Sequence, residues 1–208
     1  ALSKSRKIKF VNTRHEQIAA HAADGYARAT KKTSVLLSHL SPGLTNAATG
    51  VANAALDSIP MVVIAGDVPT HYYGKHPHQE VNLHADASQS EIYRPFVKRV
   101  WRVDSPHLFP EILEKAFALA ESGRPGPVLV DVPMDIFSKE IDVALWKQVQ
   151  LNARTVRKPS LDDETAEKIV RQLLAAKTPV LYVGGGILLA DAAEEMREFA
   201  ERLSLPVA

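Results

Sequence analysis

Two side chains stand at positions where parallel-sheet proteins place reactive groups. Glu16 opens an Ala-rich segment, 14–29, whose apolar spacing predicts a helix, and His39 follows a short apolar run just before Pro42 and Gly43. Taken alone, a glutamate in a first helical turn is explained by its favourable interaction with the helix dipole. A histidine at the carboxyl end of a strand is suited to contact a ligand. The equal alternative is a buried histidine bonded to a backbone carbonyl.

Four histidines crowd one expected loop: His71, His76, His78 and His84. A zinc site needs ligands that converge in three dimensions, and an irregular loop provides no register that would bring them together. We therefore expect no metal site in this chain and interpret the cluster as part of a substrate-facing or surface loop.

A glycine triplet at 184–186 follows an expected strand and precedes an expected helix, which is the setting of a phosphate-binding turn. The third glycine of the dinucleotide-binding pattern is absent, because Leu189 stands at its position. We interpret the triplet first as a tight turn. A nucleotide-binding Rossmann protein is a weak alternative, since no acidic ribose-binding position accompanies the triplet.

Short apolar runs alternate with amphipathic segments along the whole chain. The runs are typical of strands buried on both faces, and the segments between them carry apolar residues at helical spacing. This alternation predicts an α/β fold with a mostly parallel sheet. The expected strands are 7–11, 34–37, 61–65, 127–131 and 179–183, and the expected helices are 14–29, 46–56, 110–120, 163–174 with a capping box at Ser160 and Asp163, and 192–203.

One stretch interrupts this rhythm. After the fourth expected strand, basic and polar residues are scattered without periodicity, which is typical of a connection that runs over a surface. We place a domain boundary there, so that residues 1–133 form one domain, 134–159 a linker and 160–208 part of a second domain. The final residues, 204–208, read like the beginning of a strand, and the chain has no initiator methionine. We therefore expect a fragment.

The composition excludes several classes of protein. The 208 residues include 25 Lys and Arg against 24 Asp and Glu, 46% hydrophobic residues and no cysteine. Disordered, collagen-like, disulfide-rich and coiled-coil chains do not have this composition. Near-neutral charge argues against nucleic acid as a partner, and no apolar run is long enough to span a membrane. The lack of cysteine excludes thiol catalysis and fits a cytoplasmic protein.

Short motifs recur in a fixed order through the expected first domain. They are RHE at 14–16, DGYARAT at 24–30, SPGLTN at 41–46, DSIP at 57–60, GD at 66–67, QE at 79–80, RPFVK at 94–98, and RPGPV followed by DVP at 124–133. This set resembles the pyrimidine-binding domain of thiamine-diphosphate-dependent enzymes of the acetolactate synthase and pyruvate oxidase group. Residues 160–208 resemble the first half of the Rossmann-like central domain of the same group.

The resemblance implies thiamine diphosphate as the cofactor. In the family, a glutamate at the position of Glu16 hydrogen-bonds N1′ of the aminopyrimidine ring and promotes removal of the thiazolium C2 proton. Pro42, Gly43 and Asn46 resemble the loop that approaches this ring, where glycine allows close contact; a plain strand-to-helix turn is the alternative. Gln79 matches a glutamine that reaches the active site of the partner subunit, and without the resemblance it is an unremarkable loop residue.

Two further expectations concern protons. A carboxyl group in the role of Glu16 needs a raised pKa, and we expect burial among Ala19, Ala20 and Ala23 to raise it. Some decarboxylases of the family, including the benzoylformate type, carry a histidine at the spacing of His39 and use it in proton transfer. His39 therefore favours a decarboxylase or hydrolytic lyase over an acetolactate synthase.

The resemblance also implies a reaction and partners. The expected enzyme cleaves or forms carbon–carbon bonds in a 2-oxo acid or related carbonyl substrate, as a homodimer or homotetramer. Three departures qualify this. The first strand and helix of the family domain are missing upstream of Lys7, and the sequence at 38–41 replaces the usual Thr-Ser-Gly. The diphosphate-binding domain is also missing, so the Mg²⁺ ligands are expected outside this chain.

These departures leave alternatives. The isolated chain is expected to be inactive and to bind the cofactor poorly, because it lacks the groups that hold the diphosphate. FAD in the central domain is left open by the resemblance, since relatives there hold FAD, hold ADP or are empty. A non-catalytic α/β binding module, which keeps the family fold without its diphosphate-binding half, is the alternative function.

Overall fold

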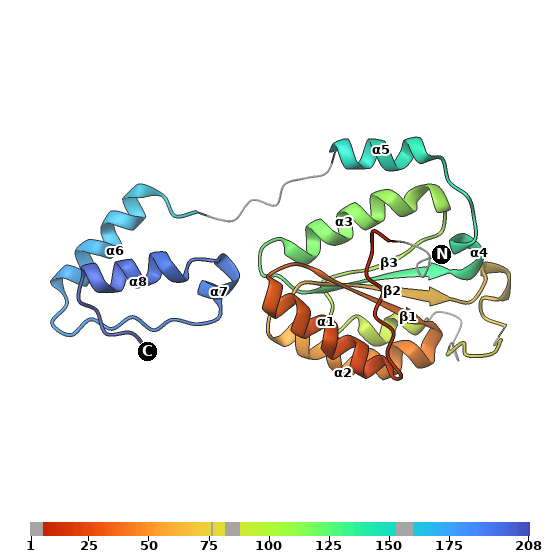
Figure 1. Cartoon of the computed structure of the whole chain (residues 1–208), viewed down its shortest axis with the longest axis horizontal. Coiled ribbons are helices and arrows are strands. Elements are labelled where there is room, and N and C mark those ends of the chain that lie inside the picture. The colour runs from red at the N-terminus through yellow and green to blue at the C-terminus, as the bar shows by residue number, and fades with distance from the viewer. Residues whose placement is uncertain (1–5, 76, 82–87, 153–159) are drawn as a thin grey trace. The chain divides into compact units, whose positions relative to one another are not determined.

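The computed structural model describes residues 6–75, 77–81, 88–152 and 160–208. The chain divides into two compact units, residues 1–156 and 157–208, and each is described by itself (Figure 1). Among the helices of the described ranges, none combines the length and the apolar character that crossing a bilayer requires.

The first unit is built on a four-stranded sheet in which every neighbouring pair is parallel. The strands lie in the order β1 (Ser34–His39), β2 (Met61–Asp67), β4 (Pro127–Pro133) and β3 (Val100–Arg102). β4 is buried along its whole length and β2 nearly so, as strands covered on both faces must be. The predicted α/β class and parallel sheet are therefore confirmed.

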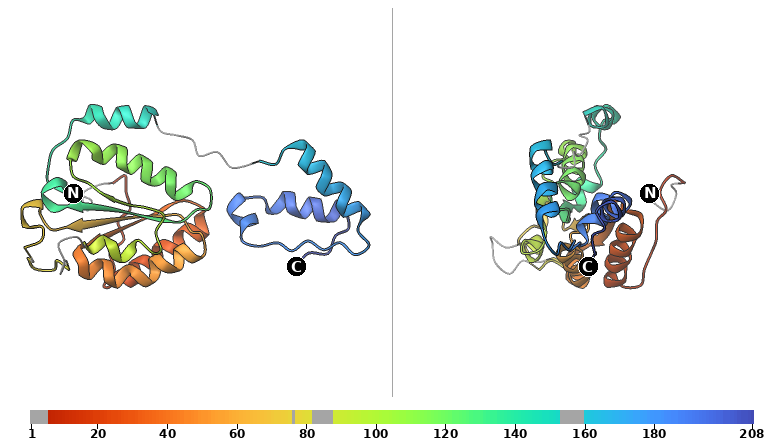
Figure 2. Two further views of the ribbon diagram at one scale, coloured as in Figure 1. Left: turned by 180° about the vertical axis from the view of Figure 1, so that it is seen from behind. Right: turned by 90° about the vertical axis from the view of Figure 1, so that its left-hand side faces the viewer.

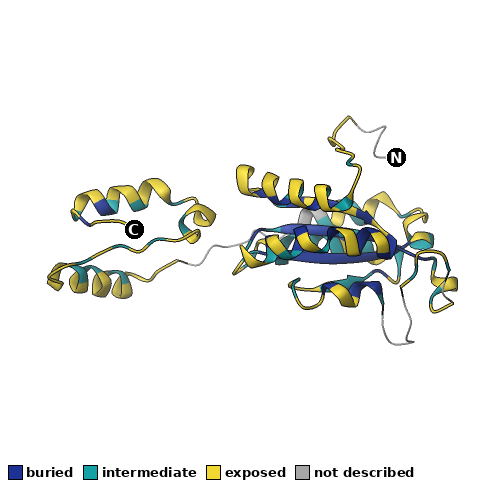
Figure 3. Ribbon diagram, turned by 90° about the horizontal axis from the view of Figure 1, so that it is seen from below, coloured by how far each residue is buried: buried dark blue, intermediate teal, exposed yellow. Residues whose placement is uncertain are grey.

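Helices cover both faces of this sheet (Figure 1, Figure 3). Met61 and Val63 of β2 join the core formed with α1 (Glu16–Thr30) and α2 (Leu40–Leu56), whereas Val62 joins the core formed with α3 (Phe109–Glu121). This division follows from the alternation of side chains along a strand. α1 and α2 approach so closely that a Cβ at Gly50 would lie 2.5 Å from the Cβ of Ala20. The small residues of α2 thus permit the contact between the helices.

The expected linker contains two helices, α4 (Met134–Phe137) and α5 (Val143–Asn152). Both helices contact the beginning of α3 through aromatic rings. The ring centroid of Phe109 lies 5.8 Å from that of Phe137 and 6.4 Å from that of Trp146. These edge-on ring contacts pack α4 and α5 against α3. The two helices were not predicted, because their basic and polar residues show no helical periodicity. Figure 2 shows α5 running alongside α3.

The strand expected at 7–11 is wrong. Residues 6–15 form no strand, and Phe10 and Val11 are 51% and 64% exposed. The apolar side chains at these positions gave the prediction, but a strand also needs a neighbour that accepts its backbone hydrogen bonds. The segment pairs with no strand of the described sheet.

The second unit contains α6 (Asp163–Ala175), α7 (Gly186–Ala190) and α8 (Ala193–Arg202). The strand expected at 179–183 is reduced to one parallel bridge, from Leu181 to Val207. Three backbone hydrogen bonds make this pairing, in which the N–H groups of Leu181, Ala208 and Val183 donate to the carbonyls of Pro206, Leu181 and Ala208 respectively. Residues 206–208, which were expected to begin a strand, therefore lie beside residues 181–183.

The capping box expected at Ser160 is replaced by a cap two residues later. Asp162 is the N-cap of α6, and its carboxylate accepts hydrogen bonds from the backbone N–H of Thr165 at 2.8 Å and from the Thr165 hydroxyl at 2.9 Å. Aspartate accepts hydrogen bonds from the free backbone N–H groups of a first turn as well as serine does. The sequence alone therefore does not show whether Ser160 or Asp162 is the N-cap.

Candidate active site

Glu16 and Asn46 meet between the first turn of α1 and the first turns of α2. The Asn46 side-chain amide donates a hydrogen bond of 3.1 Å to Oε2 of Glu16. His15 is the N-cap of α1, and its ring accepts a hydrogen bond from the backbone N–H of Gln17. The cap fixes where α1 begins, and with it the position of the Glu16 carboxylate at the helix end.

Gly43 allows the first turn of α2 to lie close to Ser38 of β1 and to the Glu16 carboxylate. A Cβ at Gly43 would lie 2.5 Å from Oγ of Ser38 and 3.7 Å from Oε1 of Glu16. A Cβ at this position would force the Ser38 hydroxyl to move, so the packing favours glycine. Ser38 ends the buried part of β1, and its hydroxyl is buried without a hydrogen-bond partner among the described residues. Three residues of the candidate site, Glu16, Gly43 and Asn46, are thus brought together.

Pro42 and Gly43 do not form the loop that the sequence suggested. α2 begins at Leu40, so both residues lie in its first turn, and Pro42 is exposed there. The change of direction from β1 to α2 falls on Leu40 itself, whose φ of 53° is left-handed. A non-glycine residue rarely adopts this conformation, and the sequence carries no glycine that would have marked the turn.

The pKa expected for Glu16 is wrong in direction. The Asn46 hydrogen bond is the largest cause that holds the pKa of Glu16 below its ordinary value, and the backbone N–H adds to this effect. Burial acts the other way but is weaker, because Glu16 is only half-buried. Ala20 is buried against α2, while Ala19 and Ala23 are only partly buried, so the alanines do not enclose the carboxylate.

His39 is the last residue of β1 and is exposed, which excludes the alternative of a buried histidine. Its ring lies over the next strand, where Nδ1 is 3.1 Å from the position that a Cβ at Gly66 would occupy. Glycine at that position leaves room for the ring. His39 therefore presents its imidazole at the carboxyl end of the sheet, near the beginning of α2.

Gln79 is exposed and has a left-handed backbone conformation, with φ of 67°. It belongs to residues 77–81, called here the Gln79 segment. The segment is attached at two points. The Glu80 carboxylate accepts a hydrogen bond of 3.0 Å from the backbone N–H of Gly74, and the Val81 N–H donates one of 2.9 Å to Oγ of Ser41. Ser41 belongs to the same turn of α2 as Pro42 and Gly43, so the Gln79 segment is tied to the element that carries the other candidate residues.

Sequence reasoning missed a buried polar network beside these residues. Gln89 is 3% exposed, and its amide nitrogen donates to the carbonyl of Gly66 and to Oδ1 of Asp131, both at 3.0 Å. Its amide oxygen accepts from the Ser41 hydroxyl at 3.0 Å. One signal was available, because Asp131 is an acidic residue inside the otherwise apolar run of β4.

Two buried carboxyl groups share this region. Burial, and then the neighbouring Asp67, raise the pKa of Asp131 to about 7. Burial likewise raises the pKa of Asp67, although Arg102 pairs with it at 3.1 Å. The guanidinium of Arg102 also lies 4.2 Å from the ring centroid of Tyr73. Near neutral pH, Asp131 therefore changes its protonation in the interior of the first unit.

Among the residues that the structure describes, the remaining candidates do not assemble into sites. His71 stacks beside Tyr72 and His78 is exposed, whereas His76 and His84 lie outside the described residues. Within the described ranges, no three metal-ligating side chains converge. At the glycine triplet, α7 begins at Gly186, and a Cβ on any of the three glycines would meet nothing within 4 Å.

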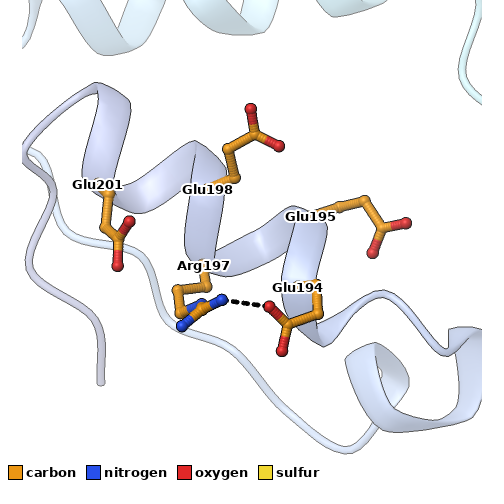
Figure 4. Close-up of a pocket in the computed structure, with 5 residues that line it drawn as sticks. All are labelled: Glu194, Glu195, Arg197, Glu198 and Glu201. Carbon is orange, nitrogen blue, oxygen red and sulfur yellow. Dashed lines mark hydrogen bonds and ion pairs between the residues drawn. The ribbon is translucent and has the colours of Figure 1, made fainter.

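A surface hollow on α8 is also unsuited to be a site. Figure 4 shows its lining, in which Arg197 pairs with Glu194 while the other carboxylates point outward from the helix. All of these side chains come from one exposed helix, so the hollow is a solvated acidic surface. It is lined by Glu194, Glu195, Arg197, Glu198 and Glu201.

Two family models match parts of the chain. Residues 1–89 match the family model of the thiamine pyrophosphate enzyme N-terminal TPP binding domain, and residues 166–208 match that of the central domain. The chain belongs to the family of thiamine pyrophosphate enzymes.

Curated relatives are acetolactate synthase large subunits. The large subunit of Buchnera aphidicola is 42% identical over 96% of this chain and 34% of its own length. That of Corynebacterium glutamicum is 42% identical over 99% of this chain and 32% of its own length. The isozyme 3 large subunit of Escherichia coli is 41% identical over 96% and 34% respectively. The chain thus spans about a third of the length of these relatives.

Proposed function

We propose that this chain forms the pyrimidine-binding side of a thiamine diphosphate site in an enzyme that forms carbon–carbon bonds from 2-oxo acids. One observation carries the proposal. The Glu16 carboxylate stands at the end of α1, held by Asn46 and facing the position where Gly43 has no side chain. Family membership and the acetolactate synthase relatives support it.

The residues present fit the aminopyrimidine part of this cofactor. A side chain at Gly43 would stand against Oε1 of Glu16, so glycine keeps this oxygen approachable for a planar ring. Ser38 adds a buried hydroxyl without a partner next to the same glycine. Glu16, Pro42, Gly43 and Asn46 would hold the ring, with the carboxylate as the acceptor of a ring N–H.

When bound, thiamine diphosphate supplies the electron sink that a 2-oxo acid needs in order to lose CO₂ and form a new bond. The chain supplies proton control. Glu16 is ionised near neutral pH, because its pKa is held below the ordinary value, and can therefore take up a proton from the ring. Asn46 keeps the carboxylate in the orientation that this exchange requires. His39, exposed at the end of β1, would hold or deliver a proton at the reacting carbon.

The remaining parts of the site come from elsewhere. We propose that Mg²⁺ and the diphosphate are held by a diphosphate-binding domain of a second subunit, so that the active form is a homodimer or homotetramer in the cytoplasm. Gln79 would face the substrate at that junction. We do not propose FAD from the glycine triplet, because the third glycine of the dinucleotide-binding pattern is replaced by Leu189. Flavin absorbance of the purified native protein tests that point.

Carbon–carbon bond formation is the reaction we favour, because the relatives carry the name acetolactate synthase. A simple decarboxylase is the second candidate, and the exposed imidazole of His39 favours it. The two differ in the acceptor, which is a second 2-oxo acid for the synthase and a proton for the decarboxylase.

The test uses the native protein, expressed from its complete reading frame, with pyruvate, thiamine diphosphate and Mg²⁺. The proposal expects acetolactate as the main product. Acetaldehyde as the main product, combined with its loss in His39→Ala, would replace the synthase by the decarboxylase. Absence of cofactor-dependent turnover across a panel of 2-oxo acids, together with absence of cofactor binding, would leave the non-catalytic binding module.

A further inference from the structure

Two left-handed residues flank one contact between α2 and the segment that carries Gln79. Leu40, at φ 53°, immediately precedes Ser41, and Gln79, at φ 67°, lies two residues before Val81. The contact between them is the hydrogen bond of 2.9 Å from the Val81 N–H to the Ser41 hydroxyl. Neither left-handed residue is a glycine, so the surrounding structure must hold both conformations in place.

The Ser41 hydroxyl is itself oriented by a buried partner. Ser41 is fully buried and donates its proton to the amide oxygen of Gln89 at 3.0 Å, which leaves its lone pairs for the Val81 N–H. The Gln89 amide cannot turn over, because its nitrogen is occupied by the carbonyl of Gly66 and by Asp131. The direction of every bond from Asp131 to Val81 is therefore determined.

We propose that Ser41 and Gln89 are positioning residues, which hold the Gln79 segment against the first turn of α2 and so set where Gln79 stands relative to the Glu16 end of the same site. The inference rests on the proposed function only for the role of Gln79. The attachment of the Gln79 segment to the ends of β2 and β4 is inferred from the hydrogen bonds alone.

Charged groups from several elements face Asp131, the buried end of this chain of hydrogen bonds. Asp67 of β2 and Asp104, which follows β3, raise the pKa of Asp131, while the Gln89 amide and Arg102 of β3 lower it. Glu80, from the segment itself, acts on Asp67 in the same direction as burial.

The test measures hydrogen exchange of the Val81 amide in the native protein. In Ser41→Ala, which introduces no clash, the exchange should be about 3- to 10-fold faster, the range expected for loss of one hydrogen bond. Thr45→Val is the matched control, because it removes a hydroxyl of the same helix that bonds only to the carbonyls of Ser41 and Pro42.

A kinetic measurement separates positioning from simple structural support. Ser41→Ala should raise KM for the 2-oxo acid about threefold or more, while deuterium exchange at C2 of the bound cofactor stays at the wild-type rate. Unchanged Val81 exchange in Ser41→Ala would overturn the inference. Faster exchange with unchanged KM and kcat would overturn the positioning role, and faster exchange in a protein without any turnover would contradict the proposed function alone.

Discussion

Asn46 donates its side-chain amide to the carboxylate of Glu16 across the contact between α2 and α1, at 3.1 Å. The bond joins two helices whose residues are 30 positions apart in the sequence, and it is the largest cause of the lowered pKa of Glu16. The protonation of the Glu16 carboxylate therefore depends on the position of α2 relative to α1. Substitution of Asn46 tests this dependence.

Removing the amide should raise the pKa of Glu16 toward its ordinary value. A carboxyl group with a lowered pKa stabilises the folded state above its unfolded pKa, and this contribution disappears as the pH falls through the folded pKa. The proposed role of Glu16 also requires an ionised carboxylate. In Asn46→Ala, the acid limb of the pH–rate profile of the native protein should therefore move to higher pH, together with the pKa of Glu16. The matched control is Asn53→Ala, because Asn53 makes the same kind of bond from α2 to Asp24 of α1. An acid limb that moves equally in both variants would contradict the assignment.

Gly43→Ala should destabilise the first unit and weaken cofactor binding. Its Cβ would lie 2.5 Å from the Ser38 hydroxyl, and overpacking of this kind costs about 1 to 3 kcal/mol. Gly25→Ala is the control, since a Cβ there meets nothing within 4 Å and alanine is favoured by up to about 1 kcal/mol inside a helix. Melting temperatures of the native protein should shift in opposite directions, and a shift in the same direction would contradict the packing argument. The double variant with Ser38→Ala should recover part of the loss.

Asp131→Asn should flatten the pH dependence of stability around β4. Unfolded, Asp131 loses its proton near pH 4, whereas burial holds the folded pKa at about 7. The stability that this difference contributes is complete below pH 4 and is lost as the pH rises to 7. At 1.36 kcal/mol per pKa unit the loss is up to about 4 kcal/mol, and asparagine should avoid it.

Hydrogen exchange of peptides covering β2 and β4, measured at pH 5 and pH 8, checks this prediction. Wild-type protection should fall between the two values, and Asp131→Asn protection should change less. Asp135→Asn is a control, because Asp135 is only partly buried and its pKa is lowered, chiefly by its hydrogen bond to the Thr70 side chain. Equal pH dependence in the wild type and Asp131→Asn would show that the buried carboxyl group is not the cause.

The long elements of the first unit were predictable from periodicity. β2 and β4 are apolar runs that are buried on both faces or nearly so, and α1 and α3 repeat apolar residues at helical spacing. β1 was also expected to be buried on both faces, but it lies at the edge of the sheet and buries only every second residue, which leaves Val35 and Leu37 exposed. β3 gave no such signal, because it has three residues and each is only partly buried. The beginning of α2 was missed because Leu40, not a glycine, makes the turn.

Of the candidate site, the sequence predicted several residues but neither the pKa of Glu16 nor the role of Gln89. The motif order identified Glu16, Gly43 and Asn46, and the structure brings these three residues together. The direction of the Glu16 pKa was missed, since sequence does not reveal that the carboxylate is half-exposed and bonded to an amide from another helix. Gln89 was missed because its partners come from separate elements, and only the folded chain places them within hydrogen-bond distance.

The central claim is that Glu16 controls a proton on bound thiamine diphosphate, and deuterium exchange at C2 of the cofactor in the native protein tests it most directly. Glu16→Gln should slow this exchange by about 100-fold or more, as removal of a general acid–base group does. Glu111→Gln, a change at the glutamate in the first turn of α3, should leave it unaltered. Exchange at the wild-type rate in Glu16→Gln, with the cofactor bound, would contradict the account.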